Sequence, residues 1–224
     1  MKTSNGKNPC GTKELRAKLG PVCFATLLAL GMVQTASAAI KADTSAANQP
    51  GIHTSTNGAT VVDINKASSD GVSHNIYSEF NVDKNGVVLN NSTVNTNTQQ
   101  AGNINGNANL AGKSATIILN EVRSSDPSQL NGMVEVAGQS AQVIIANPSG
   151  ITCDGCGFIN TNHATLTTGT ANFDETGKLT GFDVKKGQVV VTGAGMDVGN
   201  NGKPQMTDIY ARSVKVNAQL QAKN

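Results

Sequence analysis

The sequence predicts an all-β fold, and three observations carry this prediction. Short runs rich in β-branched residues recur along the chain, and each is bounded by Gly, Asn or Pro residues that favour turns. No segment after residue 38 repeats its apolar residues with the helical period of about 3.6. Aromatic residues make up only 3% of the chain and Trp is absent, so the core has to be built from small β-branched side chains.

The first 38 residues have the order of a secretory signal peptide. Basic residues precede an apolar run over residues 22–33, and the small residues Ala36, Ser37 and Ala38 follow it. We expect the Sec translocon to take up this segment, with cleavage between Ala38 and Ala39. The apolar run is shorter than the roughly 20 residues that cross a bilayer, so no stable membrane insertion is expected.

Cleavage changes the charge of the chain. The whole chain has 17 basic and 15 acidic residues, and residues 1–38 hold five of the basic and one of the acidic ones. The mature chain therefore has 12 basic and 14 acidic residues, a net charge of −2. Such a domain lacks the positive surface of a nucleic-acid-binding protein, so no nucleic acid is expected as a partner. The remaining length suits one domain, which we expect to be a monomer.

Residues 40–64 are predicted to cap one end of the fold. They are polar, contain Pro50 and Gly51, and precede the first strong strand. A cap is needed because an unpaired edge strand is a template for aggregation. The β-prone residues 209–220 lie close to the end of the chain without a polar cap, so we expect a longer protein to continue from here.

Eight strands follow from the β-prone runs. They are predicted at residues 60–64, 86–89, 115–119, 133–136, 142–146, 164–167, 188–192 and 213–216. Two architectures fit: an antiparallel sandwich or barrel, and a parallel β-helix with coils of roughly 20 to 30 residues. The abundance of asparagine favours the β-helix, because stacked Asn side chains can hydrogen-bond to one another from coil to coil.

Cys153 and Cys156 form a C-x-x-C pair with several chemical interpretations. A redox centre needs a helix amino terminus or a nearby cation, and the flanking residues supply neither. A zinc site needs two further ligands, and His53, His74 and His163 are not paired in the sequence. A disulfide that shapes a tight turn is favoured in an oxidising compartment, while free thiols and a redox or metal role stay open.

Enzymatic activity is not expected. Some parallel β-helices are polysaccharide lyases or hydrolases, which need clustered carboxylates or a basic residue over a groove. The acidic residues of the mature chain are dispersed, except for Asp174 and Glu175 beside a predicted turn. No Ser/His/Asp arrangement, phosphate-binding loop or metal-ligand cluster stands out, so we expect no catalytic residues and no cofactor.

Five segments together resemble the secretion domain of filamentous haemagglutinin-type exoproteins of two-partner secretion (TPS). They are residues 58–64, 71–75, 86–91, 118–122 and 146–161. The last segment is the most specific, because its sixteen residues include two cysteines, three glycines and a proline. The resemblance covers residues 40–223. It is closest to the cysteine-containing branch of the family, which includes CdiA-like contact-dependent growth inhibition toxins and haemolysins.

The resemblance implies a right-handed parallel β-helix with an N-terminal cap and small extra-helical β elements. It implies that residues 39–224 form the secretion domain of a large toxin or adhesin of a Gram-negative bacterium. The implied partner is an outer-membrane TpsB-type transporter, whose POTRA domains recognise the domain in the periplasm. The exoprotein is then threaded to the cell surface without ATP. Folding of the β-helix is nucleated there. The alternative is a stand-alone surface adhesion or carbohydrate-active β-helix.

The family has two short secretion motifs, for which the resemblance implies transporter recognition. Asn147, Pro148, Ser149, Gly150 and Ile151 match the second motif, with Ser149 where Asn is commoner. Pro148 and Gly150 stand at the second and fourth positions of a predicted type I turn.

The first motif of the family, Asn-Pro-Asn-Leu, corresponds to Asn107, Ala108, Asn109 and Leu110 in this chain. Loss of the proline frees φ at Ala108, which weakens the preset turn. Both Asn side chains of the motif are retained.

Overall fold

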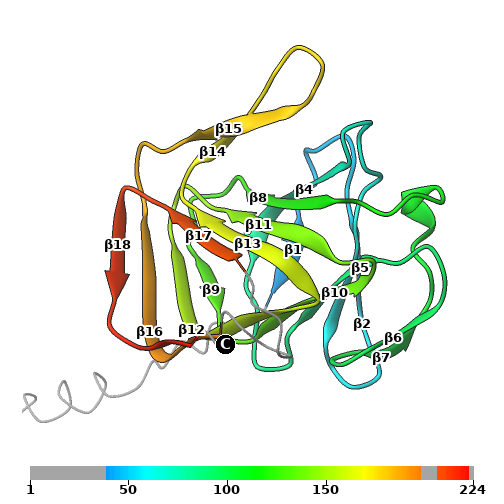
Figure 1. Ribbon diagram of the computed structural model, residues 1–224, viewed down its shortest axis with the longest axis horizontal. Coiled ribbons are helices and arrows are strands. Elements are labelled where there is room, and N and C mark those ends of the chain that lie inside the picture. The colour runs from blue at the N-terminus through cyan, green and yellow to red at the C-terminus, as the bar shows by residue number, and fades with distance from the viewer. Residues whose placement is uncertain (1–38, 198–205, 222–224) are drawn as a thin grey trace, which may run out of the picture. The chain divides into compact units, whose positions relative to one another are not determined.

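The computed structural model describes residues 39–197 and 206–221. The expected signal peptide, up to the cleavage position at Ala38, lies outside the described residues. The described residues form two large sheets of mainly parallel strands and two small antiparallel hairpins (Figure 1). Their only helical segment is the 3-10 turn η1 (Ala108–Leu110), so the predicted all-β fold is confirmed.

Sheet A is built from strands that return once per coil. In spatial order they are β1 (Ile40–Ala42), β4 (Val72–Phe80), β8 (Ile117–Val122), β11 (Ala141–Ala146), β13 (Thr161–Thr167) and β17 (Met206–Tyr210). All neighbours are parallel except β1 and β4. Ile117 lies opposite Gln142, and Gln142 opposite His163, so these two coils take 25 and 21 residues. The predicted parallel β-helix is confirmed. The predicted coil length holds for these two coils, but Val72 lies opposite Ile117 and His163 opposite Met206, so two other coils take 45 and 43 residues.

Sheet B supplies the other two sides of each coil. Its strands are β2 (Gly51–Thr54), β3 (Thr60–Asp63), β5 (Val87–Asn91), β9 (Ser128–Leu130), β10 (Met133–Gly138), β12 (Ile151–Ile159), β16 (Gln188–Asp197), β18 (Ser213–Val216) and β19 (Leu220–Gln221). The first part of β12 pairs with β9, whereas its last part pairs with β10. Sheet B therefore bends along β12, and a coil has three sides.

The N-terminal cap is shorter than predicted. β1 and β2 run antiparallel to β4 and β3, and so cover the first edge of each sheet. β3 pairs in parallel with β5 and already belongs to the first coil, where Val61 and Val62 are fully buried. The extent of 40–64 was therefore wrong at its end, because the strand predicted at 60–64 pairs in parallel with β5 and belongs to the coils.

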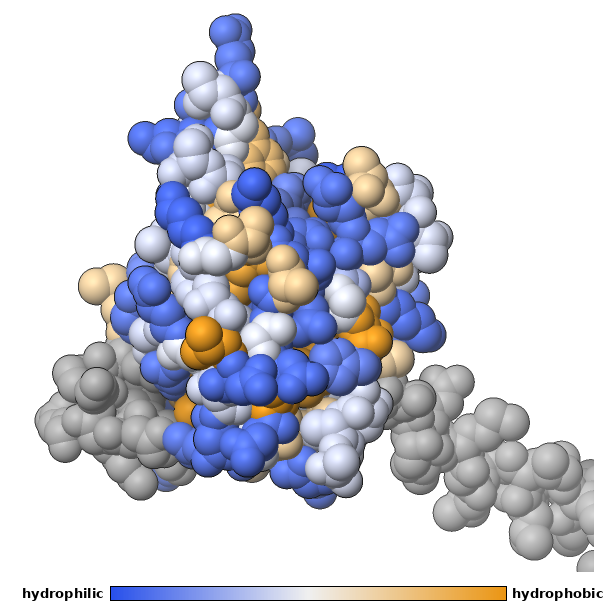
Figure 2. Space-filling model, turned by 90° about the vertical axis from the view of Figure 1, so that its right-hand side faces the viewer, coloured by the Kyte–Doolittle hydropathy of each residue, from blue (hydrophilic) through white to orange (hydrophobic). Residues whose placement is uncertain are grey.

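Two hairpins leave the coils and form the expected extra-helical elements. They pair β6 (Thr96–Thr98) with β7 (Gly102–Ile104), and β14 (Thr170–Phe173) with β15 (Leu179–Asp183). Ala171, Leu179 and Phe182 of the second hairpin pack against a buried apolar cluster on sheet A that includes Leu119 and Ile144. The face of the molecule shown in Figure 2 is largely hydrophilic, and its apolar side chains form small separate groups.

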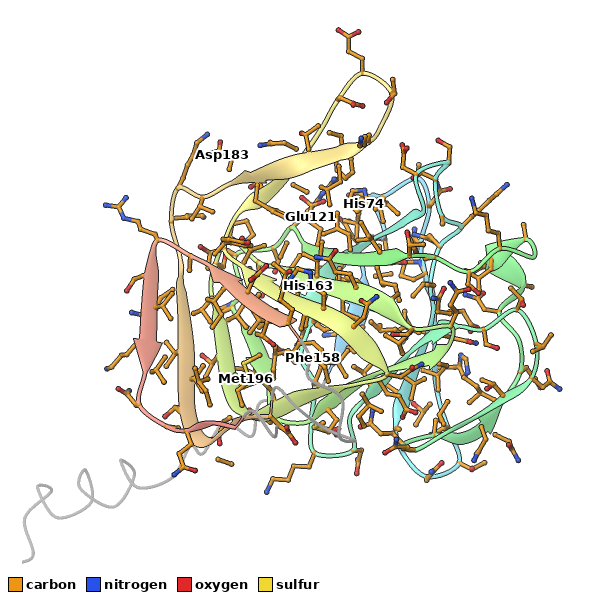
Figure 3. The ribbon with its side chains drawn as sticks, viewed as in Figure 1. His74, Glu121, Phe158, His163, Asp183 and Met196 are labelled. Carbon is orange, nitrogen blue, oxygen red and sulfur yellow. A yellow bond between two sulfur atoms is a disulfide. The ribbon has the colours of Figure 1, made fainter. Side chains whose placement is uncertain are left out.

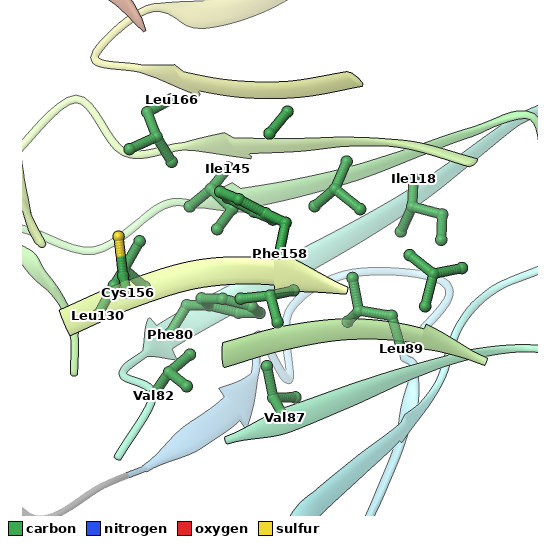
Figure 4. Packing of buried hydrophobic residues seen from close by; sticks show 14 of the residues in the cluster. Phe80, Val82, Val87, Leu89, Ile118, Leu130, Ile145, Cys156, Phe158 and Leu166 are labelled. Atoms are coloured by element: carbon green, nitrogen blue, oxygen red, sulfur yellow. The ribbon is translucent and has the colours of Figure 1, made fainter. Parts of the chain in front are cut away.

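Inward-facing side chains of successive coils stack into rows. One row contains Ile118, Val143 and Ala164, which lie opposite one another on β8, β11 and β13 and are fully buried. Phe80 and Phe158 lie among aliphatic side chains in the same core (Figure 4). The core is therefore built mainly from small and β-branched side chains, as the composition predicts.

The buried asparagines stack, but they do not form the predicted side-chain ladder. Asn75 and Asn120 lie opposite each other on β4 and β8. The Nδ2 atom of Asn75 donates to the carbonyl oxygen of Leu119 (3.4 Å), and Nδ2 of Asn120 donates to that of Ile144 (3.2 Å). The prediction was wrong about the acceptor, because buried main-chain carbonyls need partners and these amides supply them.

Substitution of Val143 tests whether the stacked side chains form the stabilising core. Val143→Ala removes two methyl groups from a fully buried position and leaves a cavity, so we expect the free energy of unfolding to fall by roughly 2 to 3 kcal/mol. Val94→Ala is the matched control, because the Val94 side chain is 68% exposed and should lose almost nothing. Urea unfolding of the two variants measures the difference, and equal stabilities would contradict the burial of Val143 in the core.

Candidate functional site

The second signature segment forms the predicted turn after β11. The N–H of Gly150 donates to the carbonyl oxygen of Asn147 (3.0 Å), which closes the turn. The side chain of Asn147 is fully buried, and its Oδ1 atom accepts from the N–H of Ser149 (2.9 Å). Its Nδ2 atom donates to the carbonyl oxygen of Asp126 and to Oγ of Ser128, both at 2.9 Å. Asn147 therefore ties the turn to the preceding coil.

The first signature segment forms an equivalent turn without proline. Asn107 caps η1, and its Oδ1 atom accepts from the N–H of Asn109 (2.9 Å). Its Nδ2 atom donates to the carbonyl oxygens of Ile64 and Asn90, both at 2.9 Å. No proline ring fixes φ at Ala108. The hydrogen bonds of Asn107 hold the turn instead, because they anchor Asn107 to two neighbouring segments.

The two turns lie at opposite ends of the strands of sheet A. Segment 107–110 precedes β8, whereas segment 147–150 follows β11, and these two strands are parallel neighbours. A strand of this length spans roughly 20 Å. The structure does not bring the two motifs together, so one partner that touches both turns must reach across the sheet.

Burial divides the signature residues into two groups. Five are buried: Asn107, Leu110, Asn147, Gly150 and Ile151. Four are partly or fully exposed: Ala108, Asn109, Pro148 and Ser149. Only the second group can contact a partner of the folded domain, and the first group maintains the turns.

Cys153 and Cys156 form a disulfide inside β12. Their Cα atoms are 5.3 Å apart, and Gly155 between them has a left-handed φ of +76°. The register between β12 and β16 shifts between Asp154 and Cys156, where Gly155 faces residues 193–195, so the extra residues of this irregularity are on β16. The predicted disulfide is confirmed, but it lies within the continuous strand β12, opposite these extra residues, and it does not close a turn.

A groove of about 840 Å³ lies between sheet A and the β14–β15 hairpin, and Pro148 and Phe173 contribute to its walls. His74 and Glu121 also line it, beneath the hairpin (Figure 3). His74 Nε2 and Glu121 Oε2 are 2.8 Å apart, and Nη2 of Arg123 donates to the same carboxylate oxygen at 3.2 Å. The ring of Phe173 lies 5.0 Å from that of His74. This groove adjoins the second signature turn, because Pro148 lines it.

The ion pairs of sheet A were not visible in the sequence. His74 and Glu121 are 47 residues apart, and His163 and Asp208, whose side chains approach to 2.7 Å, are 45 residues apart. Strand β4, which carries His74, was not predicted from the sequence, because its inward positions include the polar residues Ser73 and Asn75. The strands of sheet A place each histidine beside an acidic residue of another coil.

The buried carboxylate of Glu121 stays ionised. Burial alone would raise the pKa of Glu121, but the hydrogen bond from His74 and the positive charge of Arg123 outweigh burial and hold the pKa below its ordinary value. The contact between His74 and Glu121 links the neighbouring strands β4 and β8, and Arg123 also bonds to the carboxylate of Glu121.

No metal centre is formed by residues 39–197 and 206–221, where no three His, Cys, Asp or Glu side chains are grouped to hold an ion. The same part of the chain contains no helix that is long and apolar enough to cross a membrane.

The disulfide predicts a defined labelling pattern. The denatured, unreduced mature chain should contain no free thiol, and reduction should expose two. Replacing both Cys153 and Cys156 by Ser should lower the free energy of unfolding by about 1 to 3 kcal/mol, because a loop this short removes little entropy from the unfolded chain. The β-rich circular dichroism spectrum should not change. Two free thiols, or stoichiometric zinc, in protein isolated from the periplasm would contradict the assignment.

The Glu121 cluster predicts a pH dependence. Because the pKa of Glu121 is lower in the folded than in the unfolded state, its ionised form stabilises the fold above about pH 4.5. This contribution is lost as the pH falls through the folded-state pKa. Glu121→Gln should lower the free energy of unfolding by about 1 to 3 kcal/mol at neutral pH and make its decline in acid less steep.

Urea unfolding between about pH 3 and pH 7 measures both effects. Glu175→Gln is the control, because Glu175 is exposed in the turn between β14 and β15 and should follow the wild-type curve. A Glu121→Gln variant that loses stability in acid as steeply as the wild type would show that another group causes the acid sensitivity.

Comparisons with known proteins agree with this geometry. The family model described as the TPS secretion domain matches residues 38–224. Toxin CdiA of Yersinia pestis is 54% identical over 207 residues, which are 91% of this chain and 6% of the toxin. The tRNA nuclease CdiA-2 of Burkholderia pseudomallei (strain 1026b) is 44% identical over 204 residues, which are 90% of this chain and 6% of the nuclease.

The chain therefore spans a small part of these relatives, and the activities in their names belong to the whole proteins. A crystal structure of the filamentous hemagglutinin secretion domain is similar to this fold, with a TM-score of 0.74 and 34% identity. The similarity covers 83% of this chain and 59% of that one. From the family match, the identity to CdiA proteins and the shared fold, the chain belongs to the TPS secretion domain family.

Proposed function

We propose that this chain directs the export of a larger exoprotein through an outer-membrane TpsB-type transporter, whose POTRA domains bind it in the periplasm. The observation that carries the proposal is the match of residues 38–224 to the TPS secretion domain. Exoproteins of this family are secreted or exposed on the surface of Gram-negative bacteria. In this proposal residues 1–38 take the chain through the Sec translocon and are removed between Ala38 and Ala39.

We further propose that the parent exoprotein is a contact-dependent growth inhibition toxin. The two CdiA relatives described above are named as a toxin and a tRNA nuclease, and this chain matches only 6% of the length of each. The effector activity then belongs to another part of the parent protein, and this region acts in secretion without catalysis. Once outside the cell, its stacked coils serve as the nucleus on which further coils fold.

The transporter contacts are assigned to the exposed residues of the two turns. Asn109 lies before the start of β8, and Pro148 and Ser149 lie after the end of β11, so they are at opposite ends of the strands of sheet A. Replacement of Asn147 would be a poor test of recognition, because its amide is buried and satisfies main-chain and side-chain groups of the preceding coil. Loss of export in such a variant would follow from damage to the fold.

We predict that the double variant Asn109→Ala, Pro148→Ala is exported several-fold less than the wild type in cells with the matching transporter. The fold should survive, because Asn109 contributes one exposed hydrogen bond, from Nδ2 to the carbonyl oxygen of Asp63 (3.2 Å). The measurement compares the amount in the medium with the amount of folded protein in the periplasm.

Two controls accompany this measurement. Asn57→Ala removes a comparable exposed bond, to the carbonyl oxygen of Gln100 (2.7 Å), and should not change export. Ala108→Pro restores the family motif at the first residue of η1, where proline is favourable, and should maintain or raise export. Wild-type export of the double variant at equal periplasmic levels would refute recognition at the turns.

A further inference from the structure

We propose that the groove between sheet A and the β14–β15 hairpin binds an extended segment of the transporter that carries an acidic side chain. This inference rests on the proposed function, and it adds a second contact whose position and chemistry the signature motifs do not specify. Three features of the groove support it: its continuity with the second signature turn, its apolar wall and its charge.

The groove begins at the signature turn. Pro148 lines both the 840 Å³ groove and an adjoining hollow of about 300 Å³, and Thr170 and Lys186 also line both. The two spaces are therefore neighbours along the hairpin, from Gly177 near its tip to Lys185 at its base. A segment that contacts Pro148 can reach both of them beside β14.

One wall of the groove is apolar. Val72, Val122, Ala171 and Phe173 contribute to it. The ring of Phe173 packs against His74, yet its side chain remains 37% exposed. An aromatic ring that is fixed by one neighbour and open to solvent gives an apolar side chain of a partner a rigid surface on which to pack.

The charge of the groove is opposite to that of the domain. Its two parts are lined by three basic residues, Arg123, Lys185 and Lys186, and by two acidic residues, Glu121 and Asp183. The mature chain has 12 basic and 14 acidic residues, so the positive character is local.

Both acidic residues of the groove are already paired. Glu121 bonds to Arg123, and Asp183 lies 2.7 Å from Nζ of Lys185. Lys186 is exposed and has no ion-pair partner among the residues that the structure describes. The complementary group for Lys186 is a carboxylate of the partner, because an unpaired cation beside an apolar wall favours an anionic side chain.

Calorimetry with the purified POTRA region of the transporter tests the inference on the chain isolated from the periplasm. Lys186→Glu and Phe173→Ser should each weaken binding roughly tenfold. Raising the salt from about 50 to 200 mM should weaken binding of the wild type, and should weaken Lys186→Glu less, because screening acts on the attraction that this change removes.

Two matched variants control for net charge and for loss of apolar surface. Lys84→Glu reverses an exposed charge in the turn before β5, and Val94→Ser removes an apolar side chain that is 68% exposed. Both should bind as the wild type does, and urea unfolding should show that all four variants are folded.

The outcomes separate this inference from the proposed function. If Lys186→Glu and Phe173→Ser bind the POTRA region as tightly as the wild type does, the groove is not a contact site. Recognition of the domain by the transporter would not be contradicted. An equal loss in Lys84→Glu also overturns the groove as a contact site, because the effect would then come from net charge. If the POTRA region does not bind the wild-type chain at all, the proposed function fails, and this inference fails with it.

Discussion

The whole structure depends on the register between parallel strands of successive coils. In sheet A, Val143 lies opposite Ile118 and Ala164 and faces the core, while the neighbouring position Ile144 faces outward under the β14–β15 hairpin. A slip of one residue would exchange these faces along an entire strand. Buried amides help to hold this register, because Asn75 and Asn120 donate to main-chain carbonyls of the next coil.

The same constraint explains why the signature asparagines are buried. Asn107 and Asn147 stand at the two corners of sheet A, and each uses its Oδ1 atom to close its own turn and its Nδ2 atom to reach neighbouring segments. Their amides satisfy groups that would otherwise be buried without a partner at the corners. A motif associated with secretion therefore contains a structural part and an exposed part, and the two have different physical roles.

The hairpins show how such a scaffold acquires a specific surface. An insertion at a corner leaves the ladder between coils intact, so the fold can accommodate it at low cost. The β14–β15 hairpin packs on sheet A and places Phe173 over His74, while the coils beneath it hold Glu121 and Arg123. A groove with its own charge results, next to the turn that contains Pro148.

The sequence by itself determined the β class, the eight predicted strands, the turn at residues 147–150 and the family. These features are encoded by neighbouring residues: β-branched runs, turn formers and one contiguous signature. The pairing of Cys153 with Cys156 was also favoured, but their place within a continuous strand was not, because β12 continues through residues that look like a turn. The residue at which the cap ends was not predicted, because it depends on the pairing of β3 with β5.

Only the tertiary structure decided which groups meet across the coils. His74 contacts Glu121, and Asn107 contacts Ile64, over more than forty residues of sequence. Their adjacency depends on coil length, and two hairpin insertions change that length from one coil to the next. The burial of Asn147 and the groove beside Pro148 have the same origin, because stacking of complete coils places these residues next to segments that local sequence cannot identify.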